Sequence, residues 1–276
     1  MRHILYPILA AALFAVQIPG ASAITLHAAG STTVLPVVST AATVYHQQHP
    51  DVTITVSGGG SGVGIASMIQ HTADIGMASR DVDEDEIAKL NGKIDVLTIA
   101  KDAVAVVVSK AVYIGGVHQL SLKQIAAIYR GKIKNWKALG GPDAQIFVID
   151  KEASRGTRHV FAEAVLGNAH ARAAGASVIS GSNNEEQALV AHSNQAIGML
   201  SNAWLNDAVR GIAVGEGDHA VLPDIRHVRD GSYPISRSLH VLLPKNASPE
   251  ARNFTDFLLS KQGQVIVKKS GYLRVR

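Results

Sequence analysis

The chain has 276 residues, of which 47% are hydrophobic and 17% charged, with a formal net charge of +4 and no cysteine. This composition is typical of a globular protein, and it excludes a disulfide framework and any thiolate metal site. The basic residues are scattered without a Lys/Arg run. Nucleic-acid binding therefore gains little support, and a small anionic ligand fits the positive excess equally well. We expect no nucleic-acid partner.

The first residues have the pattern of a secretory signal. Arg2 and His3 precede an apolar run from Ile4 to Ile18, and an A-x-A cleavage site ends at Ala23. The run is shorter than the roughly 20 residues that span a bilayer, and no Cys follows it for lipid attachment. We therefore expect residues 1–23 to be a signal peptide, cleavage after Ala23, and a location in the periplasm.

Strand and helix patterns alternate along the rest of the chain. Apolar or alternating runs predict strands over 24–29, 52–56, 74–79, 96–99, 104–109, 146–149, 196–200 and 239–243. Helical periodicity predicts helices over 34–48, 62–71, 83–90, 122–129, 157–166 and 185–192, and one long helix over 249–268. This alternation favours an α/β fold with mostly parallel sheets.

Three short segments rich in Gly, Ser and Thr lie where a predicted strand passes into a predicted helix. They are GSTT at 30–33, GGGSG at 58–62 and SRGTR at 154–158. Each places small hydroxyls and backbone N–H groups at a helix N-terminus, where the helix dipole also favours negative charge. One such segment alone is better explained as a turn or a helix cap. Three in one chain predict a site where several helix N-termini surround a small oxyanion.

Motifs of catalysis and metal binding are incomplete. Ser61 has Gly59 two residues before it but Val63 two residues after it, so the G-x-S-x-G elbow of serine hydrolases is broken. The sequence has no P-loop lysine, no complete G-x-G-x-x-G and no metal-ligand spacing among its 12 His residues. We expect no enzyme activity, no metal and no cofactor.

Further motifs occur in a fixed order along the chain. They are AGSTTVLP at 29–36, SGGGSG at 57–62, ADIGMASR at 73–80, IYRG and NW within 128–136, GTR at 156–158, AIGMLS at 196–201 and YPISR at 233–237. In this order they resemble the periplasmic phosphate-binding proteins of bacterial phosphate ABC transporters. The resemblance covers essentially the whole chain after the signal.

The resemblance implies a type II periplasmic-binding fold, with two α/β lobes, two crossover strands and a ligand cleft between the lobes. Residues 24–103 and 238–276 would form the first lobe, and residues 104–237 the second. It also implies a monomeric receptor that captures inorganic phosphate and delivers it to an inner-membrane ABC permease. Ten residues would then contact phosphate: Ser31, Thr32, Thr33, Ser61, Ser79, Arg80, Lys151, Arg155, Gly156 and Thr157.

Two positions depart from the family pattern. Lys151 stands where the family usually has Arg, and a lysine cannot form the bidentate fork of a guanidinium. Arg155 stands where the family has Ser, and its side chain either reaches the ligand or points into solvent.

Selectivity for phosphate requires an acceptor for its proton, which sulfate lacks at neutral pH. Some family members carry an Asp in the stretch aligned with Ser79-Arg80. Here the nearest carboxylates are Asp81, Asp150 and Glu152. The alternatives to a phosphate receptor are a binder of sulfate, molybdate or tungstate, a phosphate sensor, an adhesin, or an exported hydrolase.

Overall fold

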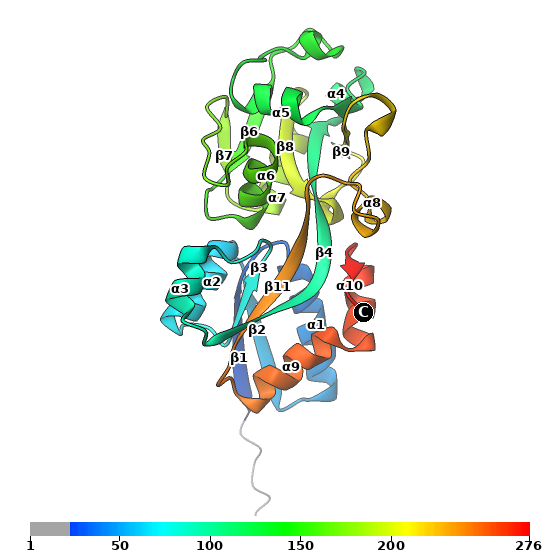
Figure 1. Ribbon diagram of the computed structural model, residues 1–276. Helices are drawn as coiled ribbons and strands as arrows, with labels where there is room; N and C mark the ends of the chain where they lie inside the picture. The colour runs from blue at the N-terminus through cyan, green and yellow to red at the C-terminus, as the bar shows by residue number, and fades with distance from the viewer. Residues whose placement is uncertain (1–22) are drawn as a thin grey trace, which may run out of the picture.

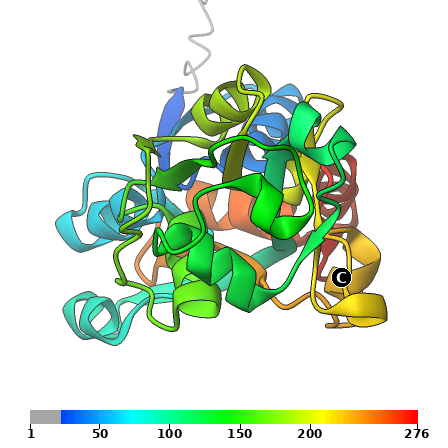
Figure 2. The ribbon, with the colours of Figure 1, turned by 90° about the horizontal axis from the view of Figure 1, so that it is seen from above.

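The computed structural model describes residues 23–276 of the chain. The expected signal peptide lies outside the described residues, except for Ala23. Two α/β bodies are stacked along one axis and joined by two long strands (Figure 1). Seen from above, the upper body lies over the lower one (Figure 2). In the part that is described, no helix is long and apolar enough to cross a membrane.

The lower body is built from both ends of the described chain. Its elements are β1 (Ile24–Gly30), α1 (Leu35–Gln48), β2 (Val52–Ser57), α2 (Ser61–Gln70), β3 (Ile75–Ala78), α3 (Glu84–Leu90), α9 (Pro249–Leu259) and α10 (Lys261–Lys269). Strand β1 pairs in parallel with both β2 and β3. Apolar side chains of α1 and α9 pack against this sheet, among them Val37, Ala41, Phe254 and Leu258.

The upper body is formed by the middle of the chain. Its strands are β5 (Gln119–Leu120), β6 (Phe147–Lys151), β7 (Val178–Ser180), β8 (Ala196–Ser201), β9 (Val209–Gly211) and β10 (Ala213–Val214). Its helices are α4 (Lys110–Ile114), α5 (Leu122–Tyr129), α6 (Gly156–Leu166), α7 (Asn183–Ala191) and α8 (Ile225–Arg229), with 3-10 turns at Trp136–Leu139, Asn202–Trp204 and Gly217–His219. Strand β6 pairs in parallel with β7 and β8. Tyr129, Trp136 and Phe161 lie at the centre of its core.

Strands β4 (Ile94–Ser109) and β11 (Ser236–Pro244) connect the two bodies. They pair with each other, antiparallel, over residues 94–103 of β4. Beyond Ala103, β4 instead pairs antiparallel with β8 of the upper body. The strand order is therefore β2-β1-β3-β11-β4-β8-β6-β7, with β9 and β12 (Leu273–Arg274) also paired to β4.

The α/β prediction is confirmed, but three details of it are wrong. The strands predicted over 96–99 and 104–109 are one strand of 16 residues, because β4 serves both sheets in turn. The helix predicted over 249–268 is two helices, since Ser260 is extended and its hydroxyl accepts from Gly263 N to begin α10. The sheets are parallel within each body but antiparallel wherever the crossover strands pair. The predicted lobe boundaries near residues 104 and 238 remain a prediction.

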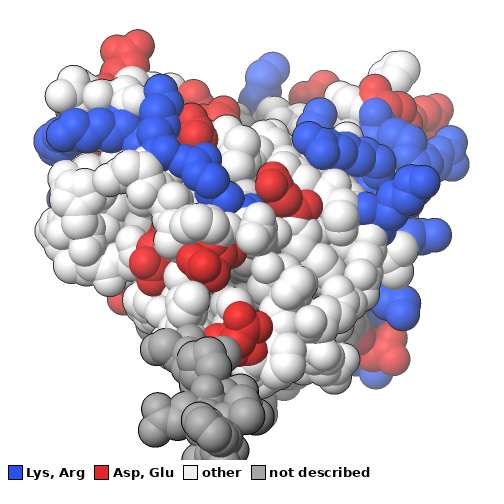
Figure 3. All heavy atoms as spheres, turned by 90° about the horizontal axis from the view of Figure 1, so that it is seen from below, with Lys and Arg blue, Asp and Glu red and all other residues white. Residues whose placement is uncertain are grey.

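Charged side chains of both signs occur on the lower end of the molecule. Lys and Arg lie mainly toward the margins of this face, with Asp and Glu among them (Figure 3).

Candidate functional site

A narrow cavity lies where the two bodies face each other. It is lined by Ser31, Thr32, Thr33, Gly60 and Ser79 from the lower body, and by Lys151, Arg155, Gly156, Thr157, Gly181, Ser182 and Asn183 from the upper body. Its volume of about 10 Å³ is close to the room that one water-sized sphere needs. The cavity therefore suits a ligand of a few atoms, and such a ligand would have to displace side chains slightly. A larger cavity of about 810 Å³ lies elsewhere, beside α7, and is mainly apolar.

The turn after β1 supplies the first group of hydroxyls. Ser31 and Thr33 are both almost fully buried. The Ser31 hydroxyl oxygen accepts hydrogen bonds from Thr33 N at 3.2 Å and Val34 N at 3.4 Å. The turn is thus held by its own side chain, and it places these hydroxyls beneath the upper body.

The Gly-rich loop after β2 contributes backbone groups to the cavity wall more than it contributes side chains. Gly60 lines the cavity, and its N–H donates to Gly30 O at 2.9 Å. The Ser61 hydroxyl accepts from Ser79 N at 2.9 Å and faces Gly156 of the upper body, where an added Cβ would meet it. Ser61 therefore positions Ser79 and does not line the cavity.

The N-terminus of α6 forms the opposite wall. The first N–H groups of a helix have no partner within the helix, so those of Gly156 and Thr157 are oriented for an anion. A side chain at Gly156 would place its Cβ 2.6 Å from Ser79 Oγ, closer than real contacts allow. Glycine at this position permits the helix end to meet the lower body.

The Arg155 guanidinium is held by a carboxylate of its own loop. Its Nε and one terminal nitrogen donate to Glu152 Oε2 at 2.8 and 2.6 Å. The sequence left open whether this side chain reaches the ligand or points into solvent. In the structure Arg155 lines the cavity, and its guanidinium pairs with Glu152, whose side chain is 48% exposed.

Lys151 is a buried cation, and its carboxylate partner was not predicted from the sequence. Its ammonium group forms an ion pair with Glu186 of α7 and donates to Ser182 O at 3.4 Å. Burial lowers the pKa of Lys151 and raises the pKa of Glu186. The mutual attraction of the pair opposes both effects. The cavity wall therefore contains the ammonium group of Lys151, and the carboxylate of Glu186 balances its charge.

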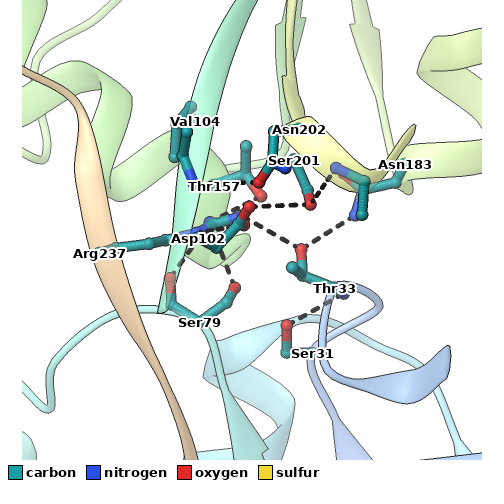
Figure 4. A network of polar contacts seen from close by, with 12 residues as sticks. Ser31, Thr33, Ser79, Asp102, Val104, Thr157, Asn183, Ser201, Asn202 and Arg237 are labelled. Carbon is teal, nitrogen blue, oxygen red and sulfur yellow. Dashed lines mark hydrogen bonds and ion pairs between the residues drawn. The ribbon is translucent and has the colours of Figure 1, made fainter. Parts of the chain in front are cut away.

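Arg237 is a second buried cation, and it was not among the site residues predicted from the sequence. From β11 its guanidinium donates to Thr157 Oγ1 at 2.9 Å, to Thr33 Oγ1 at 3.3 Å and to Ser79 O at 3.1 Å (Figure 4). Asp102 of β4 holds it through bonds of 3.0 and 2.6 Å to one carboxylate oxygen. The signals in the sequence were an Asp just before the apolar run at 104–108 and an Arg at the end of the YPISR motif.

Asn183 connects the two bodies directly and was also missed. Its side-chain nitrogen donates to Thr33 Oγ1 at 2.9 Å, although the two residues are 150 positions apart in the chain. As the first residue of α7, it adds a further helix N-terminus to the cavity wall.

Arg80 lies away from the cavity. Its guanidinium donates to both carboxylate oxygens of Glu86 at 2.7 Å each and to Asp81 O at 2.8 Å. The structure therefore brings together eight of the ten predicted residues, places Ser61 beside Ser79, and leaves Arg80 outside.

The three predicted proton acceptors also lie outside the cavity. Asp81 accepts from His240 at 2.9 Å, Asp150 pairs with Arg158 at 3.3 Å, and Glu152 pairs with Arg155 at the rim. Among residues 23–276, no group of three or more His, Cys, Asp or Glu side chains could hold a metal ion.

Comparisons with known proteins agree with this architecture. The PBP superfamily domain matches residues 15–262. The phosphate-binding protein PstS of Bacillus subtilis is 32% identical over 254 residues, which cover 91% of this chain and 80% of that protein. PstS of Borreliella burgdorferi is 28% identical, with 90% of this chain and 88% of that protein covered.

Solved structures that resemble this chain also include proteins of phosphate transport systems. A Clostridium perfringens protein, described as a candidate substrate-binding protein of a phosphate ABC transporter, was crystallised with bound phosphate. Its TM-score is 0.84 at 33% identity, covering 92% of this chain and 100% of that one. An ABC-type phosphate transport receptor of Vibrio cholerae has a TM-score of 0.71 at 31% identity, covering 90% and 99%.

Two α/β bodies around a small polar cleft define the two-lobed class of periplasmic-binding-protein folds, which confirms the class predicted from the sequence. The chain belongs to the PBP superfamily and, within it, to the family of the PstS phosphate-binding proteins.

Proposed function

We propose that this protein captures inorganic phosphate in the cavity between its two bodies. The observation that carries the proposal is the convergence of hydroxyls, helix N-termini and the buried Lys151 from both bodies on one narrow cavity, with Arg237 bonded to two of the lining hydroxyls. A desolvated oxyanion needs hydrogen bonds to all its oxygens, and this wall supplies hydroxyl and N–H donors. Ser31, Thr32, Thr33, Ser79, Lys151, Gly156 and Thr157 would contact the anion.

We further propose that the protein is a receptor that works outside the inner membrane. The relatives are named as binding proteins, and two similar structures are described as parts of phosphate transport systems. On the strength of this family membership, we propose export to the periplasm, a monomeric state and delivery of phosphate to an ABC permease. No covalent step is required, since capture and release need only opening and closing of the cleft.

The proposal is tested by calorimetric titration of the ligand-stripped protein with phosphate. We expect one site per chain, and we expect Thr157→Val to weaken binding by roughly 1–3 kcal/mol, because a buried group loses its partner. Thr255→Val is the matched control, since Thr255 is equally buried but lies in α9, where its hydroxyl donates to Ala251 O. Equal affinity of both variants and the parent would place the anion elsewhere.

A further inference from the structure

The Lys151 ammonium group lies between a buried carboxylate and the cavity. Lys151 is the last residue of β6, is 3% exposed and lines the cavity. Of its three N–H donors, one serves the ion pair with Glu186 and one the hydrogen bond to Ser182 O at 3.4 Å. The third is left for an anion in the cavity. Lys151 can therefore contact the anion and Glu186 at the same time.

The carboxylate of Glu186 is also held by protein groups other than Lys151. One oxygen accepts from Met199 N at 2.6 Å and the other from Ser180 Oγ at 3.1 Å. Gly198 leaves the space for it, because an added Cβ there would lie 2.5 Å from Glu186 Oε1. The Glu186 side chain is fully buried. Donors from β7 and β8 thus fix a negative charge beside Lys151.

Three cations beside the cavity each have a carboxylate of their own. The pairs are Arg155–Glu152, Arg237–Asp102 and Lys151–Glu186. A guanidinium keeps its proton in a protein, whereas a buried lysine can lose it. Burial lowers the pKa of Lys151, Glu186 raises it, and the charges of Arg237 and Arg155 lower it further. Lys151 is therefore the cation of the three whose charge depends on its partner.

We propose that Glu186 is a positioning residue for anion capture, which keeps the Lys151 ammonium group charged and in place at the cavity wall without touching the anion itself. The inference rests on the proposed function, because it takes Lys151 as a contact of the bound anion. A neutral amine has lost its charge and one N–H, so its hydrogen bond to an oxyanion is weaker than that of an ammonium group. Without the charge of Glu186, Lys151 would lose its proton at a lower pH, and the anion would lose a charge-assisted contact.

The test is the phosphate affinity of Glu186→Gln and of the parent, measured by calorimetry at pH 6, 7.5 and 9. The ratio of the two affinities at each pH cancels the ionisation of phosphate itself, which is common to both proteins. We expect the parent-to-variant ratio to rise at least about tenfold from pH 6 to pH 9, because the Lys151 of the variant loses its proton over this range while the parent retains it longer. Glu216→Gln, at an exposed residue of the upper body, is the control and should give a constant ratio.

The other outcomes separate the inference from the proposed function. A purely structural role of Glu186 would weaken binding equally at all three pH values, so a constant parent-to-variant ratio, small or large, overturns the inference and leaves phosphate capture intact. Absence of phosphate binding by the folded parent overturns both.

A double variant tests whether Lys151 is the group that titrates. Lys151→Met/Glu186→Gln removes both charges of the pair, and the ratio of parent to double-variant affinity should not rise with pH. A rise in this protein would assign the titration to another group and overturn the inference. If circular dichroism shows that Glu186→Gln does not fold, Glu186→Asp takes its place, because it withdraws the carboxylate by one methylene group. We expect a smaller rise of the ratio with pH in that variant, and no rise would overturn the inference.

Discussion

The guanidinium of Arg237 joins three hydroxyl-bearing segments that are far apart in the chain. It contacts Thr33, Ser79 and Thr157, and it is held by Asp102, which is fully buried. Burial raises the pKa of Asp102, and the charge of Arg237 opposes that shift. The carboxylate is therefore tolerated in the interior because the cation lies beside it.

Arg237→Met tests this dependence. Removing one partner of a buried ion pair leaves the other uncompensated, so we expect the free energy of unfolding to fall by about 3–5 kcal/mol. Urea unfolding monitored by circular dichroism measures this loss. The double variant Arg237→Met/Asp102→Leu should regain most of the stability but not the phosphate affinity, because the hydroxyls stay unanchored. Full recovery of binding in the double variant would show that Arg237 has no part in the site.

The sequence predicted the hydroxyl-bearing residues of the site but not its buried ion pairs. Ser31, Thr33 and Thr157 lie in short segments whose composition itself indicates a helix start. Arg237 and Asp102 are separated by 135 positions. Their contact arises only when β4 and β11 pair in the sheet, and no local pattern of the sequence encodes that pairing.

At the scale of elements, α6 and α3 come together from opposite bodies. His159 of α6 lies with its Nε2 3.4 Å from Asp83 Oδ1, at the start of α3. Burial lowers the pKa of His159, and the charges of Arg80 and His170 lower it further, whereas Asp83 and Glu163 raise it. The folded protein therefore binds a proton at His159 less readily than the unfolded chain does.

This difference predicts a loss of stability on acidification. Because the folded pKa of His159 lies below the ordinary value, the free energy of unfolding should fall as the pH drops below about 6.5. His159→Gln should reduce the difference in stability between pH 7.5 and 5.5, as measured by urea unfolding at both values. His219→Gln, at an exposed position of the upper body, is the control. The same pH difference in both variants would exclude His159 as its source.

Helices and strands were predicted correctly where signals within the segment itself determine its structure. The α5 prediction over 122–129 matches the structure because a capping box at Ser121 and an apolar face both mark it. The prediction failed for β4, where residues 100–103 lie between two apolar runs and include Lys101 and Asp102. The strand continues there because β11 and then β8 satisfy its backbone, which depends on the tertiary fold.

At the scale of the whole molecule, the two bodies meet through close backbone contacts. Gly62 N donates to Ser154 O at 3.0 Å across the interface, and Gly60 lies against the Arg155 side chain with no room for a Cβ. Contacts this tight describe a closed arrangement, in which an anion between the bodies would be contacted from both sides. A ligand bound in this way stabilises the folded, closed state by mass action.

Phosphate at 100 times its Kd should therefore stabilise the protein by about 2.7 kcal/mol. For a chain of this size the midpoint of thermal unfolding should rise by roughly 5–11 °C. Differential scanning calorimetry with and without phosphate measures the shift.

The Gly156→Ala variant distinguishes an anion that is held between the two closed bodies from an anion that is bound by one body alone. The added methyl group would meet Ser79 and Ser61 only when the bodies close, and alanine is otherwise favourable in a helix. If the open protein carries no such clash, its midpoint without phosphate should stay near that of the parent, while the phosphate-induced shift largely disappears. An undiminished shift in this variant would mean that one body binds the anion alone, and the joint wall of hydroxyls, Lys151 and Arg237 would then not be the feature that holds it.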